Sequence, residues 1–432
     1  MSEKIKYQTI SGMHDILPED QRYYKKIYNT VSGIADYYGF GKIDTPILEQ
    51  EELFLRGVGA STDIVEKQMY SFKTKSGDQL ALRPEWTAPI ARSYIQHGMQ
   101  SWSQPVKLWY FGPCYRYERP QAGRYRQFWQ FGFEVIGEQS PVIDAQIIQI
   151  LLNVLKDLGL KDLMIHVNSI GDSQCRPYYK KLLASYLKSR ESSLCPDCKK
   201  RMKENGLRIL DCKEEKCQPI KTEAPQILDH LCEECHAHFK EVLEFLDEAQ
   251  ISYNLNPCLV RGLDYYTKTV FEIFYCPQER KEGGEEVRMA LGGGGRYDKL
   301  IKLLGGKDIP AAGAAVGVER IVNLMKSQNI DVSEKEFVPV FLAQLGDLAK
   351  RKGLKLLEEF RIAGLKAGES FGRDSLKSQL NRADKLGAKY ALILGQKEAL
   401  DGVIIIRDME TGKQDCVKMS EAVKEVKKKL KK

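Results

Sequence analysis

The segment from Tyr115 to Gly137, YRYERPQAGRYRQFWQFGFEVIG, combines fixed positive charges with flat rings. It contains four arginines (116, 119, 124 and 126), two glutamates and seven aromatic residues. A guanidinium group binds phosphate or carboxylate through a planar fork, and each charged hydrogen bond contributes about 1.5–3 kcal/mol. A ring such as Phe128 can stack on a base while a guanidinium covers its other face. These residue types favour a nucleoside triphosphate as ligand; a surface hairpin held by salt bridges is the alternative.

The same segment predicts a long β-hairpin. Two strand-like runs flank a loop that contains Pro120 and Gly123, and alternate residues of each strand share one face. Glu134 stands near the end of the second strand among apolar neighbours. From the residues alone, Glu134 is interpreted as a salt-bridge partner at the end of a strand.

Four further segments carry residue types suited to chemistry. LALRPEWTAPIAR (80–92) supplies Glu85 and Thr87, and the Pro at position 84 predicts that a helix begins there. The glycine run in ALGGGGRYDKL (290–300) indicates close approach of the backbone to another group. The other two segments are LVRGLDYYTKTVFEI (259–273), with Arg261, Asp264, Tyr265 and Tyr266, and AAVGVERIV (314–322), with Glu319 and Arg320 at the start of a helix.

Six cysteines occur as three close pairs, in CPDC (195–198), CKEEKC (212–217) and CEEC (232–235). Cysteine pairs at this spacing are typical of tetrahedral zinc sites in a reducing compartment. The sequence predicts a structural site at Cys195, Cys198, Cys212 and Cys217, with Cys232 and Cys235 as alternative partners and His236 and His238 as further candidates. Inert paired thiols are the other interpretation. The remaining cysteines (114, 175, 258, 276 and 416) are predicted to be buried small hydrophobic residues.

The composition is that of a soluble globular protein of two or three domains. The chain has 432 residues, and Lys plus Arg exceeds Asp plus Glu by 66 − 59 = +7. This excess permits a polyanionic partner but identifies none. No apolar run approaches the roughly 20 residues of a membrane span, and the first residues lack a signal-peptide core. We therefore expect a cytoplasmic protein without a membrane partner, whose cysteines are thiols or metal ligands.

The order of elements predicts an α+β first domain and an α/β second domain. Helical spacing over 19–39 precedes a strand interrupted by Pro46, and short β-like runs alternate with turns over 67–137. A Lys-, Glu- and Cys-rich helical stretch (about 171–252) is predicted to be an insertion in this antiparallel sheet domain. We place the domains at 1–326 and 336–432, with a linker at 327–335. The last helix, SEAVKEVKKKLKK, is interpreted as a solvated face, with phosphate contact as the alternative.

Together these segments resemble the class II aminoacyl-tRNA synthetases, and specifically the histidyl-tRNA synthetase family. The arginine-rich hairpin resembles motif 2, GVERI resembles motif 3, and the segment around Pro46 resembles motif 1. RGLDYY and GGRYD are similar to two segments peculiar to the histidine enzymes. The resemblance extends from GMHDILPED (12–20) through the C-terminal domain, so it covers nearly the whole chain.

The resemblance implies how ATP would be held. Arg116 would bind the α-phosphate and the histidine carboxylate, and Arg261 would contact the α-phosphate from the opposite side. Glu118 would meet the adenine end of ATP, and the adenine ring would lie between Phe128 and Arg320. Mg²⁺ would accompany the β- and γ-phosphates.

The resemblance also implies a histidine pocket and a tRNA contact. Glu134 would accept a hydrogen bond from the substrate imidazole, with Tyr266 on the other side of the ring. The α-amino group would be held by Glu85, Thr87 and Gln130, and Trp86 and Tyr265 would line the same pocket. Trp86 stands where the family commonly has Gly, and Trp129 where His is usual. Arg119, Gln121 and Arg124, in or beside the hairpin loop, would reach the acceptor end of tRNA.

By the same resemblance, the chain would form histidyl-adenylate from ATP and L-histidine and transfer histidine to tRNA(His). It would be a homodimer joined through motif 1, and the domain from 336 would recognise the anticodon. A catalytically inactive paralogue that regulates ATP phosphoribosyltransferase is one alternative. A class II synthetase for another amino acid, such as proline or threonine, is the other. RGLDYY argues against both alternatives, and Arg116 with a full C-terminal domain argues further against the paralogue.

Overall fold

The computed structural model describes residues 7–60, 62–121, 123–277, 288–332, 338–372 and 375–431. The chain divides into two compact units, Met1–Val332 and Ser333–Lys432. Their boundary falls within the stretch predicted as a linker, 327–335, whose last three positions lie outside the described residues. Helix α10 extends to Ser327, so the first position of that stretch is still helical.

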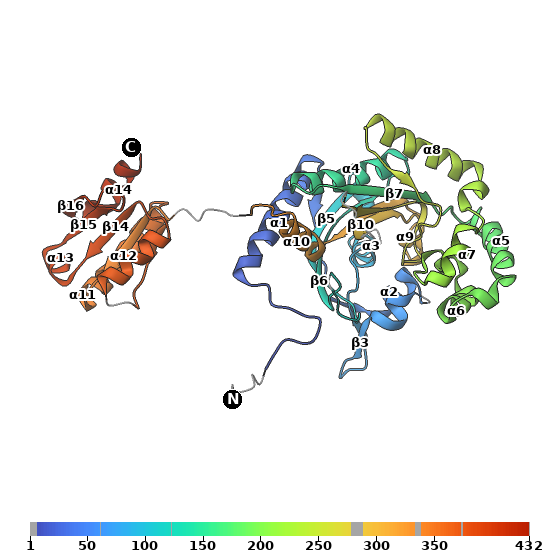
Figure 1. Cartoon of the computed structure of the whole chain (residues 1–432), viewed down its shortest axis with the longest axis horizontal. Helices are drawn as coiled ribbons and strands as arrows, with labels where there is room; N and C mark the ends of the chain where they lie inside the picture. Colours follow the sequence, from blue (N-terminus) through green and yellow to red (C-terminus); the bar gives the residue numbers. More distant parts are fainter. Residues whose placement is uncertain are drawn as a thin grey trace. The chain divides into compact units, whose positions relative to one another are not determined.

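The first unit is built on an eight-stranded sheet (Figure 1). Its five inner pairings are antiparallel, and its two edge pairings, β1 with β5 and β7 with β8, are parallel. This confirms the predicted α+β class with a mostly antiparallel sheet. In spatial order the strands are β1 (Gly41–Lys42), β5 (Val106–Tyr115), β6 (Gln127–Ile136), β11 (Ala311–Gly317), β10 (Met289–Arg296), β9 (Thr267–Tyr275), β7 (Leu163–Ser169) and β8 (Asn254–Leu255).

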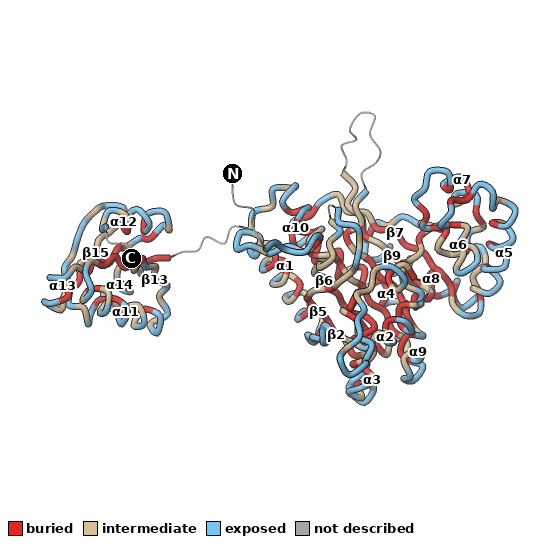
Figure 2. Tube along the Cα trace, turned by 90° about the horizontal axis from the view of Figure 1, so that it is seen from below, coloured by how far each residue is buried: buried red, intermediate tan, exposed pale blue. Residues whose placement is uncertain are grey.

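Strand β6 shows how the two faces of this sheet differ. Its odd-numbered residues Phe131, Phe133 and Val135 pack into a large core under amphipathic helices, and its even-numbered residues point to the other face. Figure 2 shows the buried interior running along these strands. The helices that supply this core are α1 (Pro18–Tyr37), α4 (Val142–Asp157), α8 (Glu233–Glu248) and α10 (Val318–Ser327).

The opposite face carries a second core that is rich in tyrosine. It is covered by α3 (Thr87–Gln96) and α9 (Leu300–Leu303). The strand expected around Pro46 is two short strands, because Pro46 lies between β1 and β2 and these belong to different sheets. The smaller sheet has the order β2 (Leu48–Gln50), β4 (Gln79–Leu82), β3 (Tyr70–Lys73), and α2 (Glu51–Phe54) with π-helical turns at Leu55–Gly59 and Ile64–Gln68 follows β2.

The predicted helical insertion lies between β7 and β8, to one side of the sheet in Figure 1. It has its own small core, in which four cysteines pack with Tyr179 and a few aliphatic side chains. Its elements before α8 are α5 (Arg176–Lys188), α6 (Pro196–Glu204) and α7 (Gln218–Thr222), with 3-10 turns at Glu191–Ser193, Gly206–Asp211, Glu215–Cys217 and Ile227–His230.

The second unit has a five-stranded mixed sheet, as predicted from the alternation of strands and helices. β12 pairs in parallel with β13 and β14, whereas β14–β15 and β15–β16 are antiparallel. The strands in order are β13 (Ala367–Glu369), β12 (Val340–Gln344), β14 (Tyr390–Leu394), β15 (Val403–Asp408) and β16 (Gln414–Lys418). The helices are α11 (Asp347–Ile362), α12 (Leu376–Lys385), α13 (Gln396–Asp401) and α14 (Ala422–Leu430). In the described part of the chain, no helix has both the length and the apolar character needed to cross a membrane.

Candidate active site

Glu134 lies on β6, on the face that α3 and α9 cover, and is completely buried. Its carboxylate accepts two hydrogen bonds, one from the Tyr297 hydroxyl to Oε2 (2.6 Å) and one from Thr87 Oγ1 to Oε1 (2.9 Å). Burial raises the pKa of Glu134 to about 8, although these hydrogen bonds oppose the shift. The site therefore holds a carboxyl group whose proton is exchangeable near neutral pH.

Tyr297 was not given a role by sequence reasoning, although the GGRYD segment that contains it was noted. The side chain is 1% exposed, and its hydroxyl ties β10 to Glu134. The adjacent Arg296 points into the fold and forms a buried ion pair with Asp144 of α4 (2.5 Å). The signal that could have identified Tyr297 was a tyrosine directly after a glycine-rich strand.

Gly313 leaves the space that the Glu134 carboxylate occupies. The two residues are paired in the register of β11 and β6, and a Cβ at position 313 would lie 1.6 Å from Glu134 Oε2. No backbone adjustment of a few tenths of an ångström can remove such an overlap. The carboxylate position therefore depends on this glycine.

A methyl group at Gly313 should displace Glu134. Gly313→Ala is expected to lower kcat/KM by about 10²-fold for a substrate that binds the Glu134 carboxyl group, because the displaced group loses aligned hydrogen bonds. Gly33→Ala on α1 is the matched control, because a Cβ there has no neighbour within 4 Å. Equal losses in both variants would contradict the steric argument.

Glu85 fixes the start of α3. Thr87 N and Ala88 N donate to its carboxylate at 2.6 and 2.8 Å, and the helix begins at Thr87. The prediction that Pro84 opens this helix was therefore wrong by three residues, because Glu85 binds the first free N–H groups from outside the helix. Burial raises the pKa of Glu85, with the two N–H groups and the charge of Arg116 acting against it.

Arg261 is a cation in the same region. Its Nη1 contacts Glu272 Oε1 at 3.0 Å, and its buried Nε has no hydrogen-bond partner among the described residues. A Cβ on Gly293 would lie 2.9 Å from Nη1, so the glycine run of β10 gives this guanidinium its room. Glu272 raises the pKa of Arg261 against the lowering effect of burial.

Arg116 and Arg261 each act on a different buried group of this region. Arg116 follows β5, donates from Nε to Pro84 O (2.9 Å), and has Cζ 5.2 Å from the centre of the Phe128 ring. Its charge lowers the pKa of Glu85, against the effect of burial. Burial raises the pKa of Tyr266, which the charge of Arg261 opposes and the charges of Glu134 and Glu85 support. Tyr266 is thus the side chain on which Arg261 and the two buried acidic groups all act.

Known proteins match this chain from near its start to near its end. A family model described as histidyl-tRNA synthetase matches residues 12–321, and one described as anticodon binding domain matches residues 339–429. The chain belongs to the histidyl-tRNA synthetase family.

Curated relatives support the same assignment. A histidine–tRNA ligase of Dehalococcoides mccartyi is 44% identical over 424 residues, covering 98% of this chain and 100% of that protein. A histidine–tRNA ligase of Desulfitobacterium hafniense is 45% identical and covers 94% of each chain. This histidyl-tRNA synthetase family member is therefore a class II aminoacyl-tRNA ligase that joins histidine to tRNA at the expense of ATP.

Solved structures show the same fold. The apo histidyl-tRNA synthetase of S. aureus superposes with a TM-score of 0.79 at 34% identity, covering 98% of this chain and 100% of that one. A Bacillus halodurans protein titled as an ATP phosphoribosyltransferase regulatory subunit/histidyl-tRNA synthetase has a TM-score of 0.61 at 21% identity. It covers 91% of this chain and 98% of its own, and at that identity it shows the fold alone.

In this synthetase the motif 3 residues brace the hairpin. Glu319 accepts hydrogen bonds from Trp129 N (2.8 and 3.0 Å) and from the Tyr24 hydroxyl (3.1 Å), and burial raises its pKa to about 7. Arg320 donates from Nε to Gly123 O (3.2 Å) and from Nη1 to Ala290 O. Arg320 thus connects the hairpin loop to β10.

The two tryptophans that depart from the family pattern lie on opposite faces of the sheet. The Trp86 ring stacks on Tyr110 (4.7 Å between centroids), and Arg83 Cζ lies 3.4 Å from the Trp86 ring centre. A Cβ on Gly112 would lie 2.6 Å from Trp86, so the ring packs against the sheet. Trp129 belongs to the opposite core and contacts Tyr24.

The predicted tRNA-contacting residues stand at the exposed tip of the hairpin. Arg119, Gln121 and Arg124 are all exposed, and Gln121 and Arg124 are joined by an isolated antiparallel bridge. Glu118 lies 3.9 Å from Arg116 and 3.8 Å from Arg124. Gln130, on the Glu134 face, accepts a hydrogen bond from Cys114 Sγ (3.4 Å).

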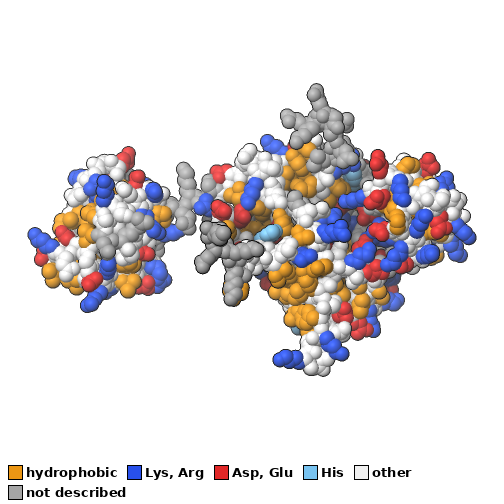
Figure 3. Space-filling view, turned by 60° about the horizontal axis from the view of Figure 1, so that its bottom comes forward, with side chains coloured by type: hydrophobic (Ala, Val, Ile, Leu, Met, Phe, Trp, Pro, Cys, Tyr) orange, Lys and Arg blue, Asp and Glu red, His pale blue; other side chains and the backbone are white. Residues whose placement is uncertain are grey.

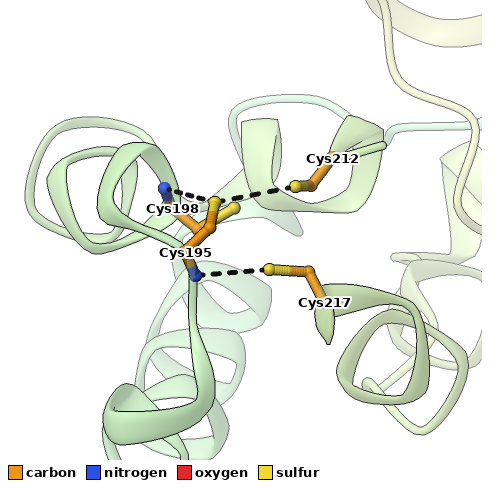
Figure 4. A group of neighbouring side chains, drawn as sticks. All are labelled: Cys195, Cys198, Cys212 and Cys217. Atoms are coloured by element: carbon orange, nitrogen blue, oxygen red, sulfur yellow. Dashed lines mark hydrogen bonds between the residues drawn. The ribbon is translucent and has the colours of Figure 1, made fainter. Parts of the chain in front are cut away.

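The four cysteines predicted as one set come together inside the insertion (Figure 4). Their sulfur atoms lie within 4.8 Å of one another, and all four side chains are buried. Cys195 N donates to Cys217 Sγ (3.4 Å), and Cys198 N donates to Cys195 Sγ (3.3 Å). Four thiols at this separation suit one tetrahedral metal ion.

The predictions for the other cysteines were confirmed only in part. Cys114 and Cys175 are buried as predicted, whereas Cys416 is exposed and Cys258 and Cys276 are half-buried. Cys232 and Cys235, the alternative partners, lie apart from the four-cysteine group and close to Asp172 and Cys175. Among the described residues, His236 and His238 belong to neither group, and His238 Nε2 lies 3.6 Å from Asp144 Oδ2.

Proposed function

We propose that the pocket around Glu134 binds the substrate histidine and that Arg116 and Arg261 bind the α-phosphate of ATP during adenylate formation. The observation that carries this proposal is a fully buried carboxyl group held by two hydroxyl groups, near a guanidinium with an unpaired buried nitrogen. Unpaired or neutral-pH-titrating polar groups of this kind are costly in a core and are typical of binding sites.

Glu134 would accept the imidazole N–H, with Tyr266 on the other side of the ring. Both side chains are buried on the same face of the sheet, and the charge of Glu134 acts on Tyr266. A side chain without a matching N–H would leave Glu134 unpaired, which supports discrimination of about 10⁴–10⁵. Glu85, Thr87 and Gln130 would hold the α-amino group, with Trp86 and Tyr265 completing the wall.

Arg116 and Arg261 would act in the reaction itself. The histidine carboxylate attacks the α-phosphorus of MgATP, the bond to the bridging oxygen breaks, and pyrophosphate leaves with that electron pair. No protein nucleophile is needed because the amino acid supplies one. Fixed guanidinium groups stabilise the charge that develops on the α-phosphate and remain protonated at any working pH. Glu118, Phe128 and Arg320 would hold the adenine.

The placement of surface residues supports proposals for the remaining partners. Arg119, Gln121 and Arg124, exposed at the hairpin tip, would contact the acceptor end of tRNA(His), and residues 336–432 would form the anticodon-binding domain. Residues 1–326 would form the catalytic domain, with 171–252 as its insertion. A homodimer would form through the motif 1 region, where Ile47 and Leu48 expose apolar side chains. The protein would act in the cytoplasm.

A structural zinc ion would be held by Cys195, Cys198, Cys212 and Cys217. The support is the grouping of four buried sulfur atoms and the N–H groups that point at two of them. The module is small, and a metal ion would supply cohesion that a core of this size lacks. This ion would brace the insertion and take no part in catalysis.

The wild-type protein should exchange labelled pyrophosphate into ATP only when L-histidine is present. Adenylate formation is reversible, so exchange reports the first half-reaction without tRNA. Each of the other amino acids, tested singly, is the control and should give less than about one-thousandth of the histidine rate. Exchange with several amino acids at comparable rates would contradict the proposed pocket.

A further inference from the structure

A second group of metal-binding side chains lies where the insertion leaves and rejoins the sheet domain. One oxygen of Asp172 and the sulfur atoms of Cys175, Cys232 and Cys235 lie within 4.8 Å of one another. Asp172 and Cys175 stand between β7 and α5, at the first end of the insertion. Cys232 and Cys235 stand at the start of α8, the helix with which the insertion returns to the core of the sheet domain. The group therefore joins segments about sixty residues apart in the sequence.

The local backbone resembles that of the four-cysteine group. Cys195 (φ −69°, ψ 161°) and Cys232 (φ −66°, ψ 162°) both directly precede a helix, and each has a second cysteine three positions later. In the first group, Cys198 N donates to the sulfur of Cys195 (3.3 Å). In the second group, Asp172 N donates to the sulfur of Cys175 at the same distance of 3.3 Å. Both groups thus consist of two ligand pairs, and N–H donors favour a thiolate.

Gly171 forms a close-fitting wall around one of these sulfur atoms. Its φ is +61°, and a Cβ on this residue would lie 2.4 Å from Cys175 Sγ. Its carbonyl accepts a hydrogen bond from Lys268 N (2.8 Å), which anchors the loop to β9. The backbone therefore approaches the sulfur more closely than any side chain would allow.

The charge around the group suits a bound cation with anionic ligands. Three thiolates and a carboxylate with one divalent ion would leave two negative charges. Two cations stand beside the group: Arg176 directly follows Cys175, and Lys268 pairs with Glu234, which lies between Cys232 and Cys235 in the chain (2.7 Å). Gln174 N donates to Asp172 Oδ1 (2.8 Å) and fixes the carboxylate. Such outer contacts orient ligands and offset their charge.

We infer that Asp172, Cys175, Cys232 and Cys235 bind a second zinc-type divalent ion, which closes the insertion at its base. Three sulfur ligands and one carboxylate oxygen at tetrahedral separation suit zinc better than the hard cations. The site would also stabilise the segment that carries Tyr266 of the proposed histidine pocket, because Arg176 donates to the backbone carbonyl of Tyr266. This inference is independent of the ligase activity and of the four-cysteine group.

Metal analysis of the full-length protein tests the inference. The wild type, purified without chelator, should contain about two zinc ions per chain. Cys232→Ser/Cys235→Ser and Cys195→Ser/Cys198→Ser should each retain about one, whereas Cys416→Ser, at an exposed thiol outside both groups, should retain two. A Cys232→Ser/Cys235→Ser variant with the wild-type zinc content would overturn the second site. A Cys195→Ser/Cys198→Ser variant that contains no zinc would overturn it as well.

Cobalt titration of the wild type answers the same question if the variants fail to fold. After zinc is removed, the visible absorption of tetrahedral cobalt–thiolate should grow until about two equivalents have been added. Saturation at one equivalent, or a thiol count showing Cys232 and Cys235 as a disulfide, would exclude the second site. Pyrophosphate exchange is measured separately, so failure of the ligase proposal and failure of the metal proposal remain distinguishable.

Discussion

Arg261→Ala should lower kcat/KM for histidine-dependent pyrophosphate exchange by about 10²–10³-fold, with the fold retained. Glu272 holds the guanidinium at 3.0 Å, and the lack of a side chain on Gly293 leaves room for it. The group therefore needs no rearrangement when charge develops on the α-phosphate. An alanine removes that charge, so Arg116 alone would stabilise the negative charge on the α-phosphate in the transition state. The loss should fall mainly on kcat, because the interaction is strongest in the transition state.

Three variants separate this effect from simple loss of an ion pair. Arg201→Ala removes a half-buried arginine that pairs with Asp63, also at 3.0 Å, and should leave exchange unchanged. Glu272→Gln keeps the guanidinium while weakening its partner, and should retain activity within about tenfold. Arg261→Lys should recover only part of the rate, because one ammonium group cannot serve Glu272 and a phosphate together. Wild-type exchange by a folded Arg261→Ala protein would remove Arg261 from the reaction.

The sequence was sufficient to predict the hairpin and the place of Glu134 within it. Strands with a period of two put Glu134 on the face opposite Phe133 and Val135, as the structure shows. The structure packs Trp129 in the same core as Phe133 and Val135, a position that the sequence left open. The second unit followed from strands that alternate with helices, an order that indicates an α/β domain. Its sheet is mixed because β15 and β16 follow each other without a helix between them and pair antiparallel.

Other features depend on contacts between residues distant in the sequence. Tyr297 meets Glu134 across 163 positions, so the local pattern that marks this tyrosine does not name its partner. Gly313 matters because of the register of β11 against β6, which periodicity does not determine. Cys175 has no nearby cysteine and was interpreted as apolar, because its neighbours arrive only when both ends of the insertion meet. The start of α3 was misplaced because a carboxylate, not the proline, satisfies its first N–H groups.

The Glu134 carboxyl group should couple histidine recognition to the pH dependence of stability. Burial holds its pKa near 8 in the folded protein, far above the ordinary value of 4.5. The folded state therefore binds a proton that the unfolded state has released between about pH 4.5 and 8. The favourable contribution of this group is complete below pH 4.5 and is lost as the pH rises through 8. Above pH 8 the buried charge costs on the order of a few kcal/mol.

Asp144 provides the comparison, since it is also buried but pairs with Arg296 at 2.5 Å. Although burial opposes it, the charge of Arg296 lowers the pKa of Asp144. Asp144→Asn should thus destabilise the protein by about 3 kcal/mol at neutral pH, because it removes the nearer of the two carboxylates that pair with the buried Arg296 and leaves only Asp298 at 3.3 Å. Glu134 is held by hydroxyl groups and has no cation as a partner in these hydrogen bonds. Removing its charge should therefore stabilise the protein at a pH above about 8, where the carboxyl group is ionised.

Glu134→Gln is accordingly expected to weaken function and strengthen the fold at high pH. The amide keeps the size and one acceptor oxygen for Tyr297 or Thr87, but it cannot release a proton to become the carboxylate that would accept the imidazole N–H. We expect kcat/KM for histidine to fall by about 10²–10³-fold with the KM for ATP nearly unchanged.

Thermal melts from pH 5 to 9 should show a smaller decline for the variant than for the wild type, with the variant more stable at pH 9. Glu319, with a pKa near 7, contributes to both curves and cancels in their difference. If the two proteins melt in parallel across this range while histidine activation is unaffected, the carboxyl group neither titrates as inferred nor contacts the substrate, and the proposed pocket loses its central residue.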